Sequence, residues 1–427
     1  MSPSLPEPGS PKGGATKGAN SLPAPSAASA PGETARSGQD GARVIVIVAD
    51  GVGCGGAPDA AAYGDSGADT LGNLARRQHG LHLPNLGALG LGNVTGIEGV
   101  AEVTAARGAW GAMREVSNGK DTITGHWEMA GLVTAQGFNT FPDGFPARIT
   151  EPLARAAGRG LLGNKAASGT AILDELGPEH LRTGALILYT SADSVLQLAA
   201  HEDVVPLPEL YRVCLEARTI ADHERIGRVI ARPFVGSPGA FRRTYNRRDF
   251  AAVPPQPTLC DVLTAAGIPV VGVGKISDIF AGRGVGQSLH SEGNDDGMRL
   301  TLEALERLRN GLLFVNLVDF DSMYGHRNDC PGFARALERM DAWLPALQAR
   351  LRPGDTVFIT ADHGNDPTTP GTDHTRERVP LLAFGPGVQA ASLGDRASFA
   401  DLGQTVAAAL GAPALAHGTS FWESIRP

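Results

Sequence analysis

The sequence lacks an excess of basic residues and any long apolar run. Its 427 residues carry 37 Lys and Arg against 45 Asp and Glu, a formal net charge of -8. Nucleic-acid binding depends on a basic surface that neutralises phosphates, so we expect no nucleic-acid partner, whereas a local basic pocket for a small phosphate remains compatible with this balance. No run approaches the roughly 20 apolar residues that a membrane helix needs, and we expect no membrane association.

Cysteine is scarce, and its spacing fits no zinc or redox motif. The four cysteines are Cys54, Cys214, Cys260 and Cys330, and none of them forms a C-x-x-C pair. Free thiols are typical of a reducing compartment, which predicts a cytoplasmic location. Residues 1–42 are rich in Pro, Gly, Ser and Ala and have no apolar signal-peptide core. Such a segment buries too little surface to offset its ordering entropy, so we expect a disordered tail.

The remainder of the chain contains apolar runs that alternate with helical patterns. The first run is "RVIVIVAD" at residues 43–50, and similar runs end at Asp193, Lys275, Asp321 and Asp362-His363. Continuous β-branched runs are typical of strands buried on both faces. Helical patterns lie between several runs, for example at 258–267 and at 294–311, where Gly311 is the expected stop. This alternation predicts an α/β fold with a doubly wound, mostly parallel sheet.

The middle of the chain differs in composition from its flanks. From about residue 137 to 251 prolines and charges are more frequent, and the segment "RPFVGSPGAFRRTYNRRDF" is rich in Arg. We therefore expect a core domain formed by residues 43–136 and 252–427. A smaller α/β cap domain, residues 137–251, is expected to be inserted into it, and the second core segment carries most of the candidate metal ligands.

Metal-capable side chains occur at the expected carboxyl ends of the strands, where ligands of open α/β sheets bind. Three carboxylates and three imidazoles take such positions: Asp50, Asp321, His326, Asp362, His363 and His374. Each alone is compatible with a turn or a helix cap. Together they could hold two divalent ions with positions open for substrate, and mixed Asp/His ligation suits Mn²⁺, Zn²⁺ or Fe rather than Ca²⁺. The joint pattern predicts a two-metal site, a kind of site that transfers phosphoryl groups.

Further polar residues stand near these runs. "GKDTITGHWEMAG" contains Thr122 and Thr124, and either hydroxyl could be a nucleophile or merely cap a turn; the spacing does not choose between them. Ser191 and Asp193 could bind a sugar hydroxyl or cap the next helix. Arg228 suits a phosphate because its guanidinium binds two oxygens at once. Lys275 follows an apolar run, where exposure explains a charge less easily.

Several long motifs, taken in order, resemble the phosphopentomutase family of the alkaline phosphatase superfamily. They span about residue 43 to the C-terminus and are "VADGVGCGGAPDAAAYGDSGADTLGN", "GKDTITGHWEMAG", "YTSADSVLQLAAHED", "RVIARPF", "VGVGKISDIFAG", "NLVDFDSMYGHRND" and "ITADHGNDPTTPGTDHTRE". The resemblance implies an isomerase that interconverts ribose 1-phosphate and ribose 5-phosphate, and their 2-deoxyribose equivalents. The reaction would pass through a phosphothreonine enzyme and a bisphosphorylated pentose. Glucose 1,6-bisphosphate or a pentose bisphosphate would prime it.

The same resemblance assigns roles to individual residues. It implies two Mn²⁺ ions, one bound by Asp50, Asp362 and His363 and the other by Asp321, His326 and His374. It names Thr122 as the phosphorylated residue. It places Ser191 and Asp193 at the sugar, and Arg228 and Lys275 at the distal phosphate. The implied partners are small-molecule pentose phosphates, and protein partners stay unknown.

Two features depart from the family pattern. Residues 1–42 have no counterpart in it. Gly51 follows Asp50 where the family suggests Ser, which puts the support of the first metal in doubt. The main alternative is a metal-dependent phosphatase or phosphodiesterase on the same scaffold. A phosphoglycerate mutase would carry Ser at position 122, and a binding protein without catalysis would have lost one of the ligands.

Overall fold

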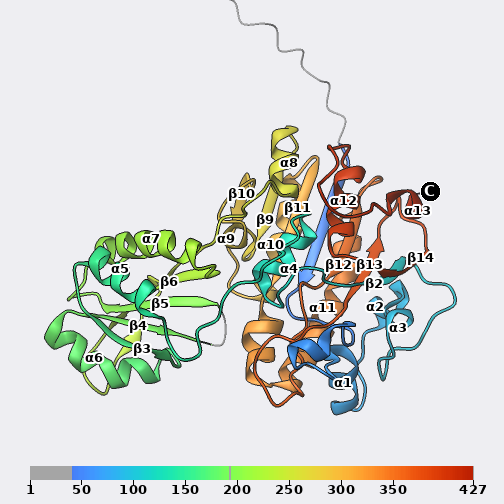
Figure 1. Ribbon diagram of the computed structural model, residues 1–427. Helices are drawn as coiled ribbons and strands as arrows, with labels where there is room; N and C mark the ends of the chain where they lie inside the picture. The colour runs from blue at the N-terminus through green and yellow to red at the C-terminus, as the bar shows by residue number, and fades with distance from the viewer. Residues whose placement is uncertain (1–40, 192–193, 427) are drawn as a thin grey trace, which may run out of the picture. The chain divides into compact units, whose positions relative to one another are not determined.

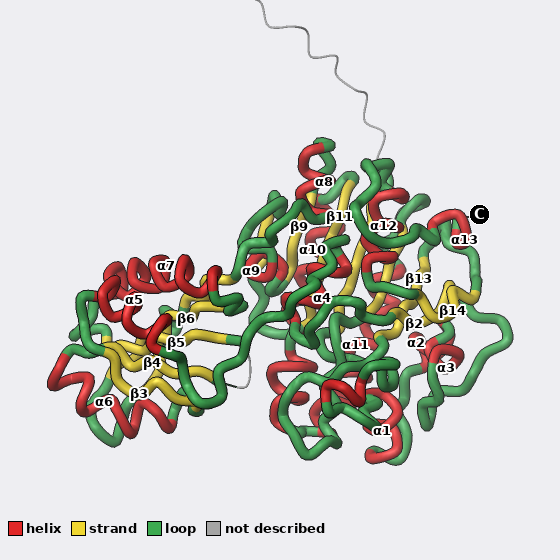
Figure 2. Tube along the Cα trace, in the orientation of Figure 1, coloured by secondary structure: helices red, strands yellow, loops and turns green. Residues whose placement is uncertain are grey.

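The computed structural model describes residues 41–191 and 194–426 (Figures 1 and 2). The expected disordered tail therefore lies outside the described residues except for Gly41 and Ala42, and so does Asp193. No described helix combines the length and the apolar character that a membrane crossing requires.

An eight-stranded sheet forms the larger part of the structure (Figure 1), in the order β10-β9-β11-β1-β12-β13-β2-β14. Its strands are β1 (Arg43–Ala49), β2 (Ala109–Met113), β9 (Val270–Val273), β10 (Gln287–Leu289), β11 (Gly311–Leu317), β12 (Thr356–Thr360), β13 (Val379–Phe384) and β14 (Ser392–Arg396). The five strands from β10 to β12 are parallel, and β13 runs antiparallel to both of its neighbours. Every residue of β1, β11 and β12 is buried. The predicted α/β fold with a mostly parallel sheet is confirmed.

Two groups of helices cover this sheet. They include α1 (Thr70–Arg77), α2 (Pro84–Leu89), α3 (Leu91–Val94), α4 (Thr122–Met129), α8 (Leu259–Ala265), α9 (Ile276–Ile279), α10 (Asn294–Arg307), α11 (Cys330–Gln348), α12 (Ala400–Ala409) and α13 (Trp422–Ile425). In one group α11 contacts α1, α2 and α10, and in the other α12 contacts α4 and α8. The expected stop of α10 at Gly311 was wrong. The helix ends at Arg307, and Gly311, with φ +112°, begins β11, where a side chain would meet the carbonyl of Pro269.

A second, six-stranded sheet has its own hydrophobic core. It consists of β3 (Leu161–Ala166), β4 (Leu186–Thr190), β5 (Val195–His201), β6 (Arg228–Val235), β7 (Arg242–Arg243) and β8 (Arg248–Ala251), with helices α5 (Ala147–Ala157), α6 (Ala171–Thr183) and α7 (Leu207–His223). All of these elements fall within the expected cap at 137–251, whose boundaries stay a prediction. Because β4 belongs to this sheet, the end of its run does not share an edge with β1.

Candidate metal centre

The candidate ligands follow three neighbouring parallel strands. Asp50 comes directly after β1, and its amide donates to the carbonyl of Leu317, the last residue of β11, at 3.2 Å. Asp362 lies two residues beyond β12. Asp321 lies four residues beyond β11 in a one-turn π-helix, Phe320–Tyr324, rather than at the strand end itself. The shared edge of the sheet therefore brings these carboxylates together.

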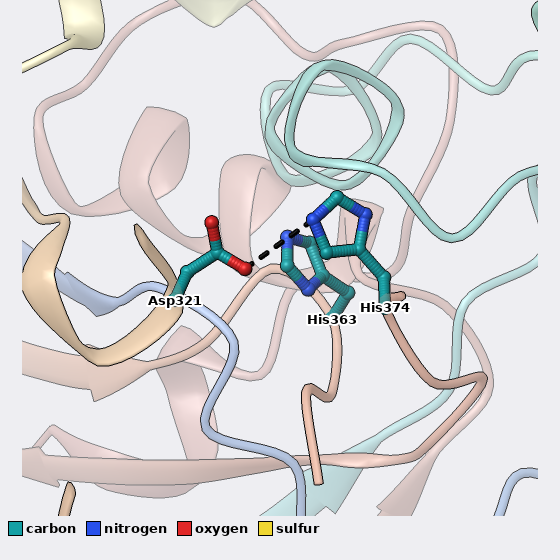
Figure 3. Close-up of side chains that lie close together, drawn as sticks. All are labelled: Asp321, His363 and His374. Carbon is teal, nitrogen blue, oxygen red and sulfur yellow. Dashed lines mark ion pairs between the residues drawn. The ribbon is translucent and has the colours of Figure 1, made fainter. Parts of the chain in front are cut away.

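The structure forms two compact groups of potential ligands, and His363 belongs to both. One group is Asp50, Asp362 and His363, and the other is Asp321, His363 and His374; within each, the ligand atoms lie within 4.8 Å of one another. All five residues are buried. Figure 3 shows the second group, in which His374 Nε2 lies 3.3 Å from Asp321 Oδ1.

His326 lies beside these groups rather than inside them. Its Nε2 is 3.3 Å from Oδ2 of Asp321, the carboxylate oxygen opposite the one that faces His374. Its Nδ1 lies 2.6 Å from the carbonyl oxygen of Thr372. A carbonyl only accepts, so Nδ1 donates this hydrogen bond, which leaves Nε2 as the nitrogen that a metal would bind.

Residues that sequence analysis missed support the carboxylates. Asn316 on β11 donates from Nδ2 to Asp50 Oδ2 at 2.8 Å, and Asn365 donates from Nδ2 to Asp321 Oδ1 at 2.7 Å. His126 Nδ1 lies 3.1 Å from Asp362 Oδ2. A polar residue such as Asn316 inside a fully buried strand was the available signal, because a buried amide needs a partner.

Gly51 contributes its main-chain amide to this arrangement. It adopts φ +79°, a conformation that favours glycine, and its amide donates to Asp362 Oδ1 at 3.1 Å. This bond comes from the main chain and does not replace a Ser side chain, so the weaker support of the first metal stays a prediction. Gly125 of α4 is similarly required, because a Cβ there would overlap the carbonyl oxygen of Asp362.

The electrostatics of the centre suit a divalent cation. Asp50 Oδ1, Asp362 Oδ2 and His374 Nε2 are buried without a well-directed hydrogen bond, and each has only ion-pair contacts within this cluster, 3.1 to 3.5 Å long. Burial, and then the charge of Asp362, raises the pKa of the Asp50 carboxyl. Burial lowers the pKa of the His363 imidazole, but Asp362 and Asp50 outweigh it and hold that pKa well above its usual value. Clustered buried carboxylates with free lone pairs are costly unless a cation compensates them, so these residues fit a divalent metal.

The two candidate threonines lie in different surroundings. Thr122 is the first residue of α4, and its Oγ1 lies 3.2 Å from His363 Nε2. Thr124 is fully buried, and its hydroxyl donates to Asp121 Oδ2 at 2.6 Å. Asp121 also accepts from the amides of Ile123 and Thr124, which caps the helix. Only Thr122 of this pair has its hydroxyl beside the ligand groups.

The structure brings only some of the predicted substrate-binding residues to the cavity beside Thr122. Thr122, Arg228 and Lys275 line one cavity of about 700 Å³. Arg228 Nη1 lies 3.9 Å from Asp249 Oδ2. Ser191 is half-buried directly after β4 and does not line this cavity. Asp193 lies outside the described residues, so its predicted role at the sugar is untested.

Comparisons with known proteins agree with this geometry. The Metalloenzyme superfamily matches residues 42–414. A phosphopentomutase of Anaeromyxobacter dehalogenans is 58% identical over 380 residues, covering 89% of this chain and 98% of that protein. A phosphopentomutase of Alkaliphilus oremlandii is 52% identical over 385 residues, covering 90% of this chain and 99% of that protein. The chain is thus a metalloenzyme-superfamily isomerase and belongs to the phosphopentomutase family.

Proposed function

We propose that the chain interconverts ribose 1-phosphate and ribose 5-phosphate, and their 2-deoxyribose equivalents, through phosphorylated Thr122. The observation that carries this proposal is the position of Thr122 Oγ1, 3.2 Å from His363 Nε2 at the junction of both ligand groups. The fixed hydrogen bond of Thr124 to Asp121 supports the choice of Thr122 over its neighbour.

The proposed metal ligands are Asp50, Asp362 and His363 for one ion, and Asp321, His326 and His374 for the other. Two Mn²⁺ ions, when bound, would neutralise charge on the transferring phosphoryl group and lower the pKa of the threonine hydroxyl. The supporting contacts from Asn316, Asn365 and the Gly51 amide would hold the carboxylates in place.

The proposed reaction has two phosphoryl transfers. In the first, the bond between Thr122 Oγ1 and phosphorus breaks as the free hydroxyl of the pentose phosphate bonds to phosphorus, and the hydroxyl proton ends on Thr122. The pentose bisphosphate then reorients, and its other phosphoryl group transfers to Thr122 Oγ1. The proton of the Thr122 hydroxyl passes to the sugar oxygen that is released. The residues of the cap would exclude water, which would otherwise hydrolyse phosphothreonine.

Arg228 and Lys275 are proposed to bind the distal phosphate, since both line the cavity that reaches Thr122. Ser191 and Asp193 are proposed to bind the sugar. Glucose 1,6-bisphosphate or a pentose bisphosphate would supply the first phosphoryl group to Thr122. We also propose that the enzyme works in the cytoplasm, consistent with four buried, unpaired cysteines.

A coupled assay tests the proposal. The protein is incubated with Mn²⁺, a trace of glucose 1,6-bisphosphate and ribose 5-phosphate, and purine nucleoside phosphorylase with a free base traps ribose 1-phosphate as nucleoside. A parallel sample without the coupling enzyme measures free phosphate. Nucleoside formation without phosphate release in the parallel sample is the expected result. Phosphate release without nucleoside would instead identify a phosphatase on this scaffold.

A further inference from the structure

Arg376 is a buried arginine two residues beyond His374. Its side chain is 2% exposed, and Nη1 donates to Glu115 Oε2 at 2.6 Å. Nε and Nη2 donate to the two oxygens of Asp59 at 3.1 and 3.0 Å. Its Cζ lies 4.8 Å from the ring centroid of Tyr63, a cation–π distance. Both edges and one face of the guanidinium are therefore fixed.

The remaining hydrogen bonds of Arg376 reach the main chain just ahead of Thr122. The two N–H groups of Nη1 are shared between Glu115 Oε2 and the carbonyl oxygens of Ser117 and Gly119, which lie 2.9 and 2.6 Å away, and Nη2 donates to the carbonyl of Glu115 at 2.7 Å. These three carbonyls belong to one segment, which ends three residues before Thr122. Arg376 lies on the loop that carries His374. Its side chain thus fixes the main-chain segment that leads to Thr122, the proposed nucleophile.

A second set of contacts joins the same two segments. Lys120 Nζ lies 3.3 Å from Asp373 Oδ2 and 3.1 Å from Asp65 Oδ2. The Asp65 carboxylate also accepts from the Arg376 amide at 2.8 Å. The segment before Thr122 therefore contacts residues on both sides of His374, Asp373 through Lys120 and Arg376 through its guanidinium.

We propose that Arg376 is a positioning residue for phosphoryl transfer, which holds the segment 115–119 so that Thr122 Oγ1 stays against His363. The inference rests on the proposed role of Thr122 as nucleophile. Phosphoryl transfer depends on alignment, and a misplacement of about 1 Å can cost about 100-fold in rate. A lysine retains the charge at Glu115 but cannot contact Asp59 and three carbonyls in one plane.

The test is Arg376→Lys, studied in the full-length, Mn²⁺-loaded protein. We expect kcat with ribose 5-phosphate to fall about 100-fold, KM to change less than about 3-fold, and metal content to stay at the wild-type level. The rate of phosphoryl transfer from glucose 1,6-bisphosphate to the protein, followed by intact mass, should fall by the same factor as kcat. Wild-type kcat in the folded variant would overturn the proposal, and so would a loss of activity that merely follows a loss of metal.

Arg43→Lys is the matched control. Arg43 is also a buried arginine, with a carboxylate partner in Asp355 and carbonyl partners in Leu305, Leu308 and Arg350, but it lies at the start of β1. Its replacement should lower Tm as Arg376→Lys does and leave kcat unchanged. An equal fall of kcat in both variants would reduce Arg376 to a stabilising residue.

Asp59→Asn provides a second route if Arg376→Lys does not fold. The Asp59 side chain is 46% exposed, so its loss leaves no charge buried alone, and Arg376 keeps Glu115. We expect kcat to fall about 3- to 10-fold with little change in Tm, and an unchanged kcat would overturn the proposal. Thr122→Ala runs in parallel. Full activity in Thr122→Ala would refute the proposed nucleophile, whereas an inactive Thr122→Ala beside an unaffected Arg376→Lys would refute only the positioning role.

Discussion

Both ends of β1 bury charged side chains. At the start of the strand the charge has a full set of partners, and at the far end it does not. At the start of the strand, Arg43 is 1% exposed, and its guanidinium is matched by both oxygens of Asp355 and by three carbonyls. At the far end, Asp50 Oδ1 and Asp362 Oδ2 are buried without a well-directed hydrogen bond, and both share the single imidazole of His363 as an ion-pair contact. Removing one partner of a matched buried pair is strongly destabilising, whereas two buried carboxylates that share one imidazole are costly until a further cation binds. One end of the strand serves stability, and the other gives up stability for a metal site.

The largest expected effect is a loss of activity without a loss of stability, beside the metal end of β1. Thr122→Ala should lower mutase activity by at least about 1,000-fold, because the phosphoryl acceptor is gone. Metal content and Tm should stay close to the wild-type values, since no ligand is removed. Thr124→Ser, which keeps the hydroxyl that donates to Asp121, is the control and should retain activity. Activity in Thr122→Ala, measured by the coupled assay, would remove Thr122 from the site.

At the opposite end, Arg43→Met should affect stability alone. It leaves Asp355 buried without its partner, and breaking such a pair costs about 3–5 kcal/mol of the free energy of unfolding. The kcat of the folded fraction should not change. The double variant Arg43→Met/Asp355→Leu should recover much of the loss in urea unfolding, because no lone charge remains. A lowered kcat in Arg43→Met would show that the two ends are not independent.

The part of this comparison that could be read from the sequence depends on local pattern. The run 43–49 identified a buried strand, and the carboxyl-end rule placed Asp50 and Asp362 beside it. The rule needs only the strand and its direction. It failed for the run that ends at Asp193, because an apolar run does not encode which of two sheets it joins.

Contacts between distant segments could not be predicted in this way. Glu115 and Arg376 are separated by 261 positions, and no period or spacing connects them. The same holds for Asn316 and Asp50, which are 266 positions apart. Choosing Thr122 over Thr124 by spacing alone was impossible for a related reason, since both hydroxyls fit the motif and only the fold distinguishes their neighbours.

Glu377, which lies near the metal loop, is intermediate between the well-paired Arg43 and the poorly paired Asp50 and Asp362. It is a buried charge-capable group with hydrogen bonds but no charged partner among the described residues. Its buried carboxyl accepts from Gly55, Thr70 and Thr375, and burial nevertheless raises its pKa from 4.5 to about 7. Between pH 4.5 and 7 the native state therefore binds a proton that the unfolded state does not. The free energy of unfolding should fall as pH rises through this window, by up to about 3 kcal/mol.

Glu377→Gln should remove this part of the pH dependence. Urea unfolding of the metal-free protein, in a chelator at pH 5 and pH 7.5, measures it for the wild type and the variant. Glu423→Gln, at a side chain that is 73% exposed, is the control and should keep the wild-type slope. Equal slopes in wild type and Glu377→Gln would mean that the carboxyl is ionised throughout and that its hydrogen bonds outweigh burial.

The smallest expected effect tests whether a residue that hydrogen-bonds a metal ligand affects metal affinity rather than the free energy of unfolding. Asn316→Ala removes the Nδ2 donor to Asp50, together with an Oδ1 that is buried without a partner. We expect Mn²⁺ affinity, measured by calorimetric titration, to fall about 10- to 100-fold, as is typical when a residue supporting a metal ligand is lost. Unfolding in chelator should change little, because the lost hydrogen bond and the lost unpaired oxygen offset each other.

Asn85→Ala is the matched control for this last comparison. Asn85 Nδ2 donates at 2.9 Å to Asp341, a buried carboxylate that also accepts from the amide of Leu86 and lies in neither ligand group. Its loss should lower stability and leave Mn²⁺ affinity unchanged. If instead both variants bind Mn²⁺ like the wild type, Asp50 needs no fixed partner, and the metal alone would organise that end of β1. A weaker affinity in Asn316→Ala only would show that the protein orients Asp50 before the metal binds.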